Sequence, residues 1–346
     1  MTSLILKNSK PISLEDESFR SNLLNIASRI DNVIPLGRGD PDFHTPQHIV
    51  EAAKKALDDN LHHYTVPSGV EELREAISEN FKKKFNLNYS KEEIIVTAGV
   101  QESIALAMLS ILNNDDEVLI TSPRFTAYDL AVRMCNAKPV PVPTFEKNNF
   151  SLMPDEISKR ITSRTKILVL VSPNNPTGAV TPPEKIIEIA EIVKKNKLIV
   201  IADEIYADLV YENHTHLSIG SLEEMKERTL TLNGFSKTYA MTGWRIGYIA
   251  GPLDIIVKMI EIRHALSINS CTFSQYGAIA ALKGPQNQFI EMKEEYDVRR
   301  KFCMHALRSM GLSYGEPGGA FYIYTNVSAS GMKASAFSEL LLKKTG

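Results

Sequence analysis

Short apolar runs rich in Val, Ile and Leu alternate with longer amphipathic segments through the middle of the chain. The runs have the length and composition of β-strands, and they cover residues 93–97, 117–121, 138–143, 166–172, 197–203, 228–233 and 245–251. Segments with apolar residues at helical spacing lie between them, and these include residues 100–112, 125–135 and 183–195. Because several of the strands are apolar without interruption, we expect both faces of their sheet to be covered. The pattern predicts an α/β fold with a mostly parallel central sheet between helices.

The alternation of strands and helices does not extend to the ends of the chain. A helix is predicted at 13–29, and after about residue 285 the pattern changes to a long amphipathic segment, a strand at 318–327 and a final helix. We therefore expect a large α/β domain over 47–285. Residues 1–46 and 286–346 would together form a smaller α+β domain.

Composition and charge narrow the class of protein. The 346 residues include 43% hydrophobic and 23% charged side chains, which is ordinary for a soluble globular protein. A net charge of -2 does not suggest nucleic-acid binding, and no apolar run approaches the length of a membrane span. The N-terminus is too polar for a signal peptide and the three cysteines are scattered, so we expect a cytoplasmic protein with reduced thiols. The few clustered histidines have no cysteine or carboxylate set at ligand spacing, so no metal site is predicted.

Ligands of parallel sheets bind at the carboxyl ends of the strands, so the loops after the strands are candidates for a functional site. After the first strand, Gly99, Val100 and Gln101 open a helix whose backbone N–H groups could hold an anion, although many strand–helix turns look like this. After the second, Phe125 could stack on a planar ring or belong to the core of the next helix. After the fourth, Asn175 offers an amide in the PNNPTG turn, which could also be only a rigid loop.

Two later strand ends carry ionisable side chains. Asp203 ends an apolar strand, where a carboxylate needs a cationic partner, hydrogen bonds or a helix-capping role, and Tyr206 follows three residues later. Lys237 comes after the strand at 228–233, and Arg245 follows it eight residues on. A desolvated lysine forms Schiff bases with carbonyl groups and arginine binds phosphate, although both could instead be solvated. Taken together, these loops fit pyridoxal 5′-phosphate (PLP), which combines an aldehyde, a ring nitrogen, a ring hydroxyl and a phosphate.

The same loops resemble those of a known family. The segments GDPDFHTP, YTVPSGVEELREAI, TAGVQESI, SPNNPTG, ADEIY and NGFSKTYAMTGWRIGY are similar to motifs of fold-type I PLP enzymes and occur in the order of that family. Within this fold the chain resembles the class I/II aminotransferases, in the aspartate-aminotransferase-like subgroup. The resemblance covers essentially the whole chain and implies a large PLP-binding domain with PLP as cofactor.

The resemblance also implies a role for each residue around the cofactor ring. Lys237 would form the Schiff base with PLP, and Asp203 would pair with the pyridine nitrogen. Tyr206 and Asn175 would hydrogen-bond the ring oxygen, while Phe125 would stack on the ring. Lys237, Asp203 and Tyr206 are the catalytic residues that this similarity implies.

The phosphate has implied partners of its own. Gly99, Val100 and Gln101 would offer backbone N–H groups to it, and Arg245 would bind it directly. Tyr64 resembles a tyrosine that reaches the phosphate of the neighbouring subunit. The similarity therefore implies a homodimer with its sites at the interface.

A further set of residues is implied around the substrate. Gly39 and Asn175 would both bind the substrate, with Gly39 against its carboxylate end. Arg38 could reach a distal carboxylate of the substrate, or it could pair with an aspartate of its own loop. Some relatives have Ser or Thr where this chain has Gly234, so Ser236 would take part of that role.

The activity implied by the resemblance is transamination. An L-amino acid, with aspartate or a related amino acid as the expected donor, would pass its amino group to a 2-oxo acid, with 2-oxoglutarate as the expected acceptor. The same residues serve C–S lyases and other non-transaminating fold-type I enzymes, and a non-enzymatic PLP-sensing domain is a further alternative. The family usually continues past the position of Gly346 into a strand whose arginine clamps the substrate carboxylate. We therefore expect the small domain to be truncated and activity to depend on the missing segment.

Overall fold

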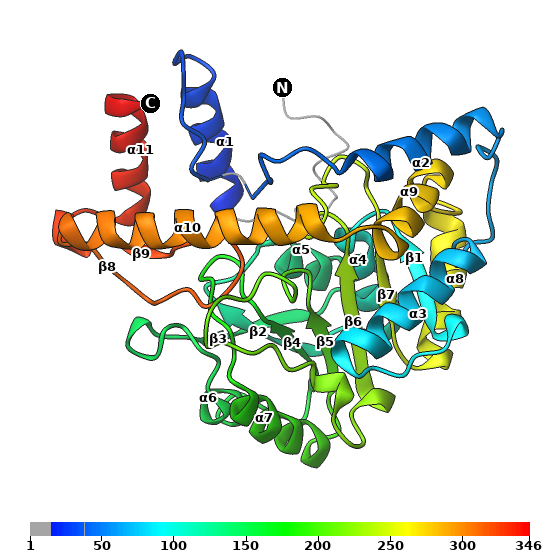
Figure 1. The fold of residues 1–346 in the computed structure, drawn as a ribbon. Helices are drawn as coiled ribbons and strands as arrows, with labels where there is room; N and C mark the ends of the chain where they lie inside the picture. Colours follow the sequence, from blue (N-terminus) through cyan, green and yellow to red (C-terminus); the bar gives the residue numbers. More distant parts are fainter. Residues whose placement is uncertain (1–14, 38) are drawn as a thin grey trace, which may run out of the picture.

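A seven-stranded sheet forms the centre of the molecule in the computed structural model, which describes residues 15–37 and 39–346 (Figure 1). The strands follow the order β1–β7–β6–β5–β4–β2–β3. They span Ile94–Thr97 (β1), Glu117–Ser122 (β2), Lys138–Pro143 (β3), Thr165–Val171 (β4), Ile199–Asp203 (β5), Thr229–Gly234 (β6) and Gly247–Ala250 (β7). Neighbouring strands from β6 to β3 are parallel, and β7 runs antiparallel to both β1 and β6. The predicted α/β fold with a mostly parallel sheet is confirmed.

Helices cover both faces of the sheet, as continuous apolar strands require. They span Gln47–Asp58 (α2), Glu71–Phe85 (α3), Val100–Ile111 (α4), Ala127–Met134 (α5), Pro154–Ser158 (α6), Pro183–Lys195 (α7), Leu253–Leu266 (α8) and Thr272–Lys283 (α9). Successive residues of a strand point to opposite faces. In β4, Ile167 and Val169 lie in a buried cluster with residues of α4 and α8, whereas Leu168 and Leu170 lie in another with residues of α7. Burial on both faces explains why this stretch of β4 has no polar position.

The two ends of the described chain lie together on one side of this core (Figure 1). They form α1 (Glu15–Ala27), α10 (Asn287–Ser309), β8 (Ser313–Tyr314), β9 (Thr325–Asn326) and α11 (Ala334–Thr345). Helix α1 packs against α11, and the backbone N–H of Ile34 donates to the carbonyl oxygen of Gly346 at 2.8 Å. This arrangement agrees with a small domain built from both chain ends, while the boundaries at residues 46 and 285 stay a prediction.

One predicted strand is wrong over most of its length. Residues 318–327 form a strand only at Thr325–Asn326. Upstream, Ala320 has a positive φ of 56°, and its backbone N–H donates to the carbonyl oxygen of Leu209, in the loop after β5, at 2.8 Å. The segment therefore lies against the loops at the sheet edge instead of pairing along a neighbouring strand. The helix predicted at 13–29 is α1, with its first two residues outside the described part.

Two further features bear on the class of protein. Within residues 15–37 and 39–346, no helix is both long and apolar enough to span a bilayer. The same residues contain no group of three or more His, Cys, Asp or Glu side chains placed to hold a metal ion.

Candidate functional site

Lys237 lies in the loop between β6 and β7, just beyond the carboxyl end of β6. Its Nζ donates a hydrogen bond of 2.6 Å to the carbonyl oxygen of Gly39, and it lies 6.0 Å and 5.7 Å from the ring centres of Tyr206 and Phe321. Burial lowers the pKa of the Lys237 amine, although the nearby carboxylate of Asp40 opposes the shift. A lowered pKa increases the fraction of neutral amine, which is the form that attacks carbonyl groups.

Asp203 ends β5 and is only 6% exposed. The hydroxyl of Tyr128 donates to its Oδ2, and the backbone N–H of Ile205 donates to its Oδ1 at 3.1 Å. The bond from Ile205 belongs to a local turn, whereas the bond from the buried Tyr128 shows that the side chain points into the interior. Neither donor carries a charge, and burial raises the pKa of the carboxyl to about 6. A cationic N–H group facing this side chain would stabilise its ionised form.

The side chains of Tyr206, Tyr322 and Asn175 form hydrogen bonds close to Lys237. Tyr206 Oη lies 2.6 Å from Tyr322 Oη, and Asn175 Nδ2 donates to Tyr322 Oη at 3.4 Å. Burial raises the pKa of Tyr206 well above its ordinary value, so its hydroxyl stays protonated and able to donate. A β-carbon at Gly39 would clash with Tyr322 Oη. Gly39 therefore borders the same point as the two tyrosines.

Sequence reasoning missed Tyr322, because the aromatic run at 318–327 has the pattern of a strand. The pair Gly318–Gly319 before it was the available signal. A β-carbon at Gly319 would lie 2.6 Å from Pro173 Cγ, in the turn after β4. A contact this close to the proline ring requires glycine, and it brings the aromatic run to the sheet edge.

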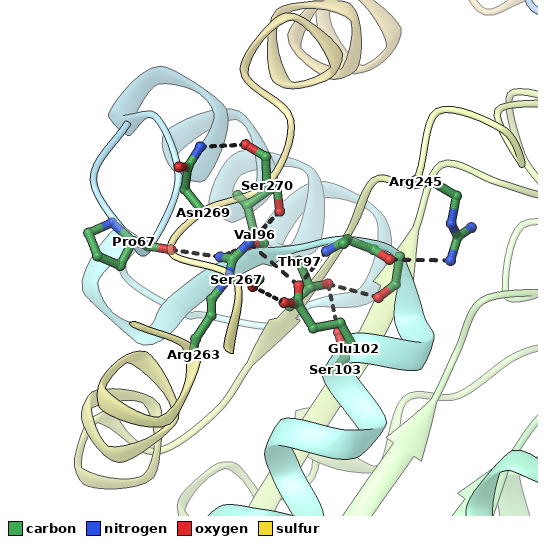
Figure 2. A network of polar contacts seen from close by, with 12 residues as sticks. Pro67, Val96, Thr97, Glu102, Ser103, Arg245, Arg263, Ser267, Asn269 and Ser270 are labelled. Atoms are coloured by element: carbon green, nitrogen blue, oxygen red, sulfur yellow. Dashed lines mark hydrogen bonds and ion pairs between the residues drawn. The ribbon is translucent and has the colours of Figure 1, made fainter. Parts of the chain in front are cut away.

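The N-terminus of α4 and Arg245 form a candidate anion site (Figure 2). Gly99 precedes the helix with a φ of 82°, and Val100 and Gln101 belong to its first turn, whose N–H groups have no partner within the helix. Arg245 Nη2 donates to the carbonyl oxygen of Ala98 at 3.2 Å. A β-carbon at Gly99 would lie only 2.7 Å from this nitrogen, so the guanidinium lies close against the helix end. This combination suits a phosphate group.

The remaining predicted residues have different surroundings. Phe125 is partly buried and packs against a core cluster, which agrees with its interpretation as a core aromatic. Ser236 is half-buried beside Lys237. Tyr64 is 81% exposed, so most of its surface is available to a second molecule. Arg38 lies outside the described residues.

Comparison with known proteins decides among the chemistries that such a site could support. A model of the family described as aminotransferase class I and II matches residues 31–346. The chain belongs to this family. Its predicted membership, enzyme class and activity as a PLP-dependent aminotransferase are confirmed.

Similar proteins and structures agree with this assignment. The chain is 44% identical over 334 residues to an aspartate aminotransferase of Pyrococcus abyssi, which covers 96% of this chain and 86% of the relative. It is 42% identical over 325 residues to aromatic-amino-acid aminotransferase 2 of Thermococcus litoralis, with 93% and 84% covered. The structure of an aspartate aminotransferase from Thermus thermophilus with maleate has a TM-score of 0.87 at 35% identity, with 95% and 86% covered.

The residues present fit the PLP of this aminotransferase family. The buried carboxyl of Asp203, whose hydrogen-bond donors are uncharged, suits a protonated ring nitrogen. The cradle at Gly99, which has a φ of 82° and lies close to the Arg245 guanidinium, suits the phosphate. The partly desolvated amine of Lys237 suits the aldehyde. The roles of these individual residues stay predictions.

Proposed function

We propose that Lys237 binds the cofactor and moves the α-proton of the substrate during transamination. The environment of its Nζ supports this most strongly, since it combines partial burial, a lowered pKa and a hydrogen bond to Gly39. When bound, PLP supplies a carbonyl carbon for amines and a ring that withdraws electrons. The neutral amine of Lys237 is a base that accepts a proton at Nζ and can return it. The Gly39 carbonyl oxygen holds this amine at a fixed position.

Asp203, Tyr206 and Asn175 would hold the cofactor ring. The ionised Asp203 would face the pyridine nitrogen, and its burial among uncharged donors supports this role. Tyr206 and Asn175 would donate to the ring oxygen, and their approach to one common point at Tyr322 Oη supports it. Phe125 would stack on the ring.

Arg245 and the backbone N–H groups of Gly99, Val100 and Gln101 would bind the phosphate. The position of the guanidinium against the N-terminus of α4 supports this assignment, since both carry positive charge. Ser236 would add a hydroxyl donor from the lysine loop.

The proposed donor is aspartate, with 2-oxoglutarate as acceptor. Three relatives, which are 44%, 40% and 38% identical to this chain, are named aspartate aminotransferase. Aromatic amino acids are a second candidate, because the rings of Tyr206, Phe321 and Tyr322 pack together close to Lys237. A relative named for aromatic amino acids supports this second candidate.

The proposal is tested by adding one amino acid at a time to the PLP-loaded protein, without an oxo-acid acceptor. The visible absorption band of the PLP-loaded protein should bleach on addition of aspartate, and the product should be the corresponding 2-oxo acid. Stronger bleaching by tyrosine or phenylalanine would favour the aromatic class. Release of pyruvate and ammonia without an oxo-acid acceptor would favour a lyase. Lys237→Ala should form no 2-oxo acid, even if its absorption changes when the amino acid condenses with the PLP aldehyde, whereas Lys54→Ala, at an exposed position on α2, should react like the wild type as the matched control.

We also propose a cytoplasmic homodimer in which Tyr64 reaches the phosphate site of the neighbouring subunit. The high exposure of this large side chain supports the proposal. Coexpression of Lys237→Ala with Tyr64→Ala tests it, because the hybrid dimer would contain one site with both residues intact. Activity above the sum of the two separate variants is expected, and no recovery would contradict a shared site.

A further inference from the structure

Arg263 on α8 is completely buried, which is unusual for an arginine. It donates to the carbonyl oxygens of Pro67, at 2.6 Å, and of Val96, and to Ser270 Oγ at 2.5 Å (Figure 2). Its Nη2 lies 3.5 Å from Oε2 of Glu102. Because an isolated buried charge is costly, Glu102 serves as the counter-ion of this arginine.

Glu102 lies in the first turn of α4, next to the candidate phosphate site. Its Oε2 accepts a hydrogen bond from the backbone N–H of Ala98 at 2.5 Å, and its Oε1 accepts one from the Ser267 hydroxyl at 2.6 Å. The carbonyl oxygen of Ala98 accepts the bond from Arg245 (Figure 2). Ala98 is thus held at its N–H by Glu102 and at its carbonyl by the proposed phosphate arginine.

A carboxylate at this place requires an explanation, because a negative charge close to a phosphate weakens its binding. The positive charge of Arg263 balances the negative charge of Glu102. The N-terminus of α4 and the Arg245 guanidinium can therefore still attract an anion. Stability is a weak explanation for the pair, since apolar residues can often replace a buried ion pair without loss of stability. What the pair adds is a fixed position for the turn before α4.

The same arginine also reaches the segment that carries Tyr64. Pro67, whose carbonyl oxygen accepts from Arg263, lies three residues after this tyrosine. On the other side of Tyr64, the hydroxyl of Thr272 donates to the carbonyl oxygen of His63 at 2.7 Å. The segment is therefore held at both ends, and one of its anchors is shared with the phosphate site.

We propose that Glu102 and Arg263 are positioning residues for the cofactor phosphate. Glu102 holds the turn at Ala98 so that the N–H groups of α4 and the Arg245 guanidinium converge on the phosphate. Arg263 fixes Glu102 and joins this turn to the segment that carries Tyr64. The inference rests on the proposed function, because it requires PLP to bind at Lys237.

The test compares PLP with pyridoxal, which has the same ring and aldehyde but no phosphate. Dissociation constants are measured by absorbance titration of the cofactor-free full chain. Glu102→Ala should weaken PLP binding about tenfold, as expected for loss of a hydrogen bond to a charged group, and pyridoxal binding by less than about twofold. Glu102→Gln keeps an oxygen that can accept from the Ala98 N–H, so it should retain most of the PLP affinity.

Ser267→Ala removes only the bond to Oε1, so it should weaken PLP binding less than Glu102→Ala. Glu102→Ala leaves the buried Arg263 without its counter-ion, so the free energy of unfolding of each variant is measured alongside its affinity. Ser267→Ala keeps the ion pair in place and keeps the proposal testable if Glu102→Ala does not fold. If Glu102→Ala weakens the binding of PLP and of pyridoxal equally, Glu102 has only a structural role and the proposal is overturned. Unchanged PLP affinity in this variant would also overturn it. If the wild-type protein does not bind PLP at Lys237, the proposed function itself is refuted, and the positioning role of Glu102 and Arg263 is refuted with it.

Discussion

Replacing Asp203 with Asn should change how the stability of the cofactor-free protein depends on pH. Burial raises the pKa of the native carboxyl from 3.8 to about 6, so the native state binds this proton more tightly than the unfolded chain. The resulting stabilisation is fully present below about pH 4 and is lost as the pH rises through about 6. A shift of roughly two pKa units corresponds to about 3 kcal/mol. The Asn variant does not titrate, and its side-chain oxygen can still accept from the N–H of Ile205.

Urea unfolding of the cofactor-free wild type and Asp203→Asn measures this effect. Both proteins are compared at equal concentration, because the stability of a dimer depends on concentration. Between about pH 4.5 and about pH 8, the free energy of unfolding of the wild type should fall by about 2 kcal/mol relative to the variant. A constant difference over this range would refute the reasoning. Saturating PLP should reduce the pH dependence, because a cationic ring nitrogen would lower the pKa of the carboxyl.

Two further substitutions test the phosphate cradle and the hydroxyl pair. Gly99→Ala would add a β-carbon 2.7 Å from Arg245 Nη2 at a φ of 82°, so PLP should bind about tenfold more weakly by absorbance titration. Gly243→Ala meets no atom within 4 Å and should leave the affinity unchanged; equal losses in both would contradict the assignment. Tyr322→Phe removes the hydroxyl that lies 2.6 Å from Tyr206 Oη, which should weaken Tyr206 as a hydrogen-bond donor. The pH at which the absorption band of the bound cofactor is half changed should therefore rise. The rise should be smaller than in Tyr206→Phe. A wild-type midpoint in Tyr322→Phe would show that the hydroxyl pair has no effect on the cofactor.

The sheet and the loops at its edge follow from the sequence for a physical reason. Uninterrupted apolar runs, such as that of β4, require cover on both faces, and parallel strands bring their carboxyl ends to one edge. Asp203 and Lys237 could therefore be expected near each other, and the charge of each influences the pKa of the other. The family resemblance, and not the pattern, supplied the individual role of each residue, and these roles stay predictions.

Other parts of the site depend on tertiary contacts that local patterns do not contain. Tyr322 lies in an aromatic run that looks like a strand, but the backbone at Ala320 bonds to the loop after β5. Arg263 and Glu102 look like ordinary charged residues of amphipathic helices. Only the packing of α8 against α4 buries the arginine and brings the two charges to 3.5 Å.

Chemical trapping tests most directly whether Lys237 is the residue that binds PLP. Borohydride reduction of the PLP-loaded protein turns a Schiff base into a stable bond, and mass spectrometry of the peptides then locates the modified lysine. We expect the label on the peptide that contains Lys237 and no label on Lys237→Ala, whereas Lys54→Ala should be labelled like the wild type. A label on another lysine in the wild type, or full labelling of Lys237→Ala, would contradict the assignment of this site.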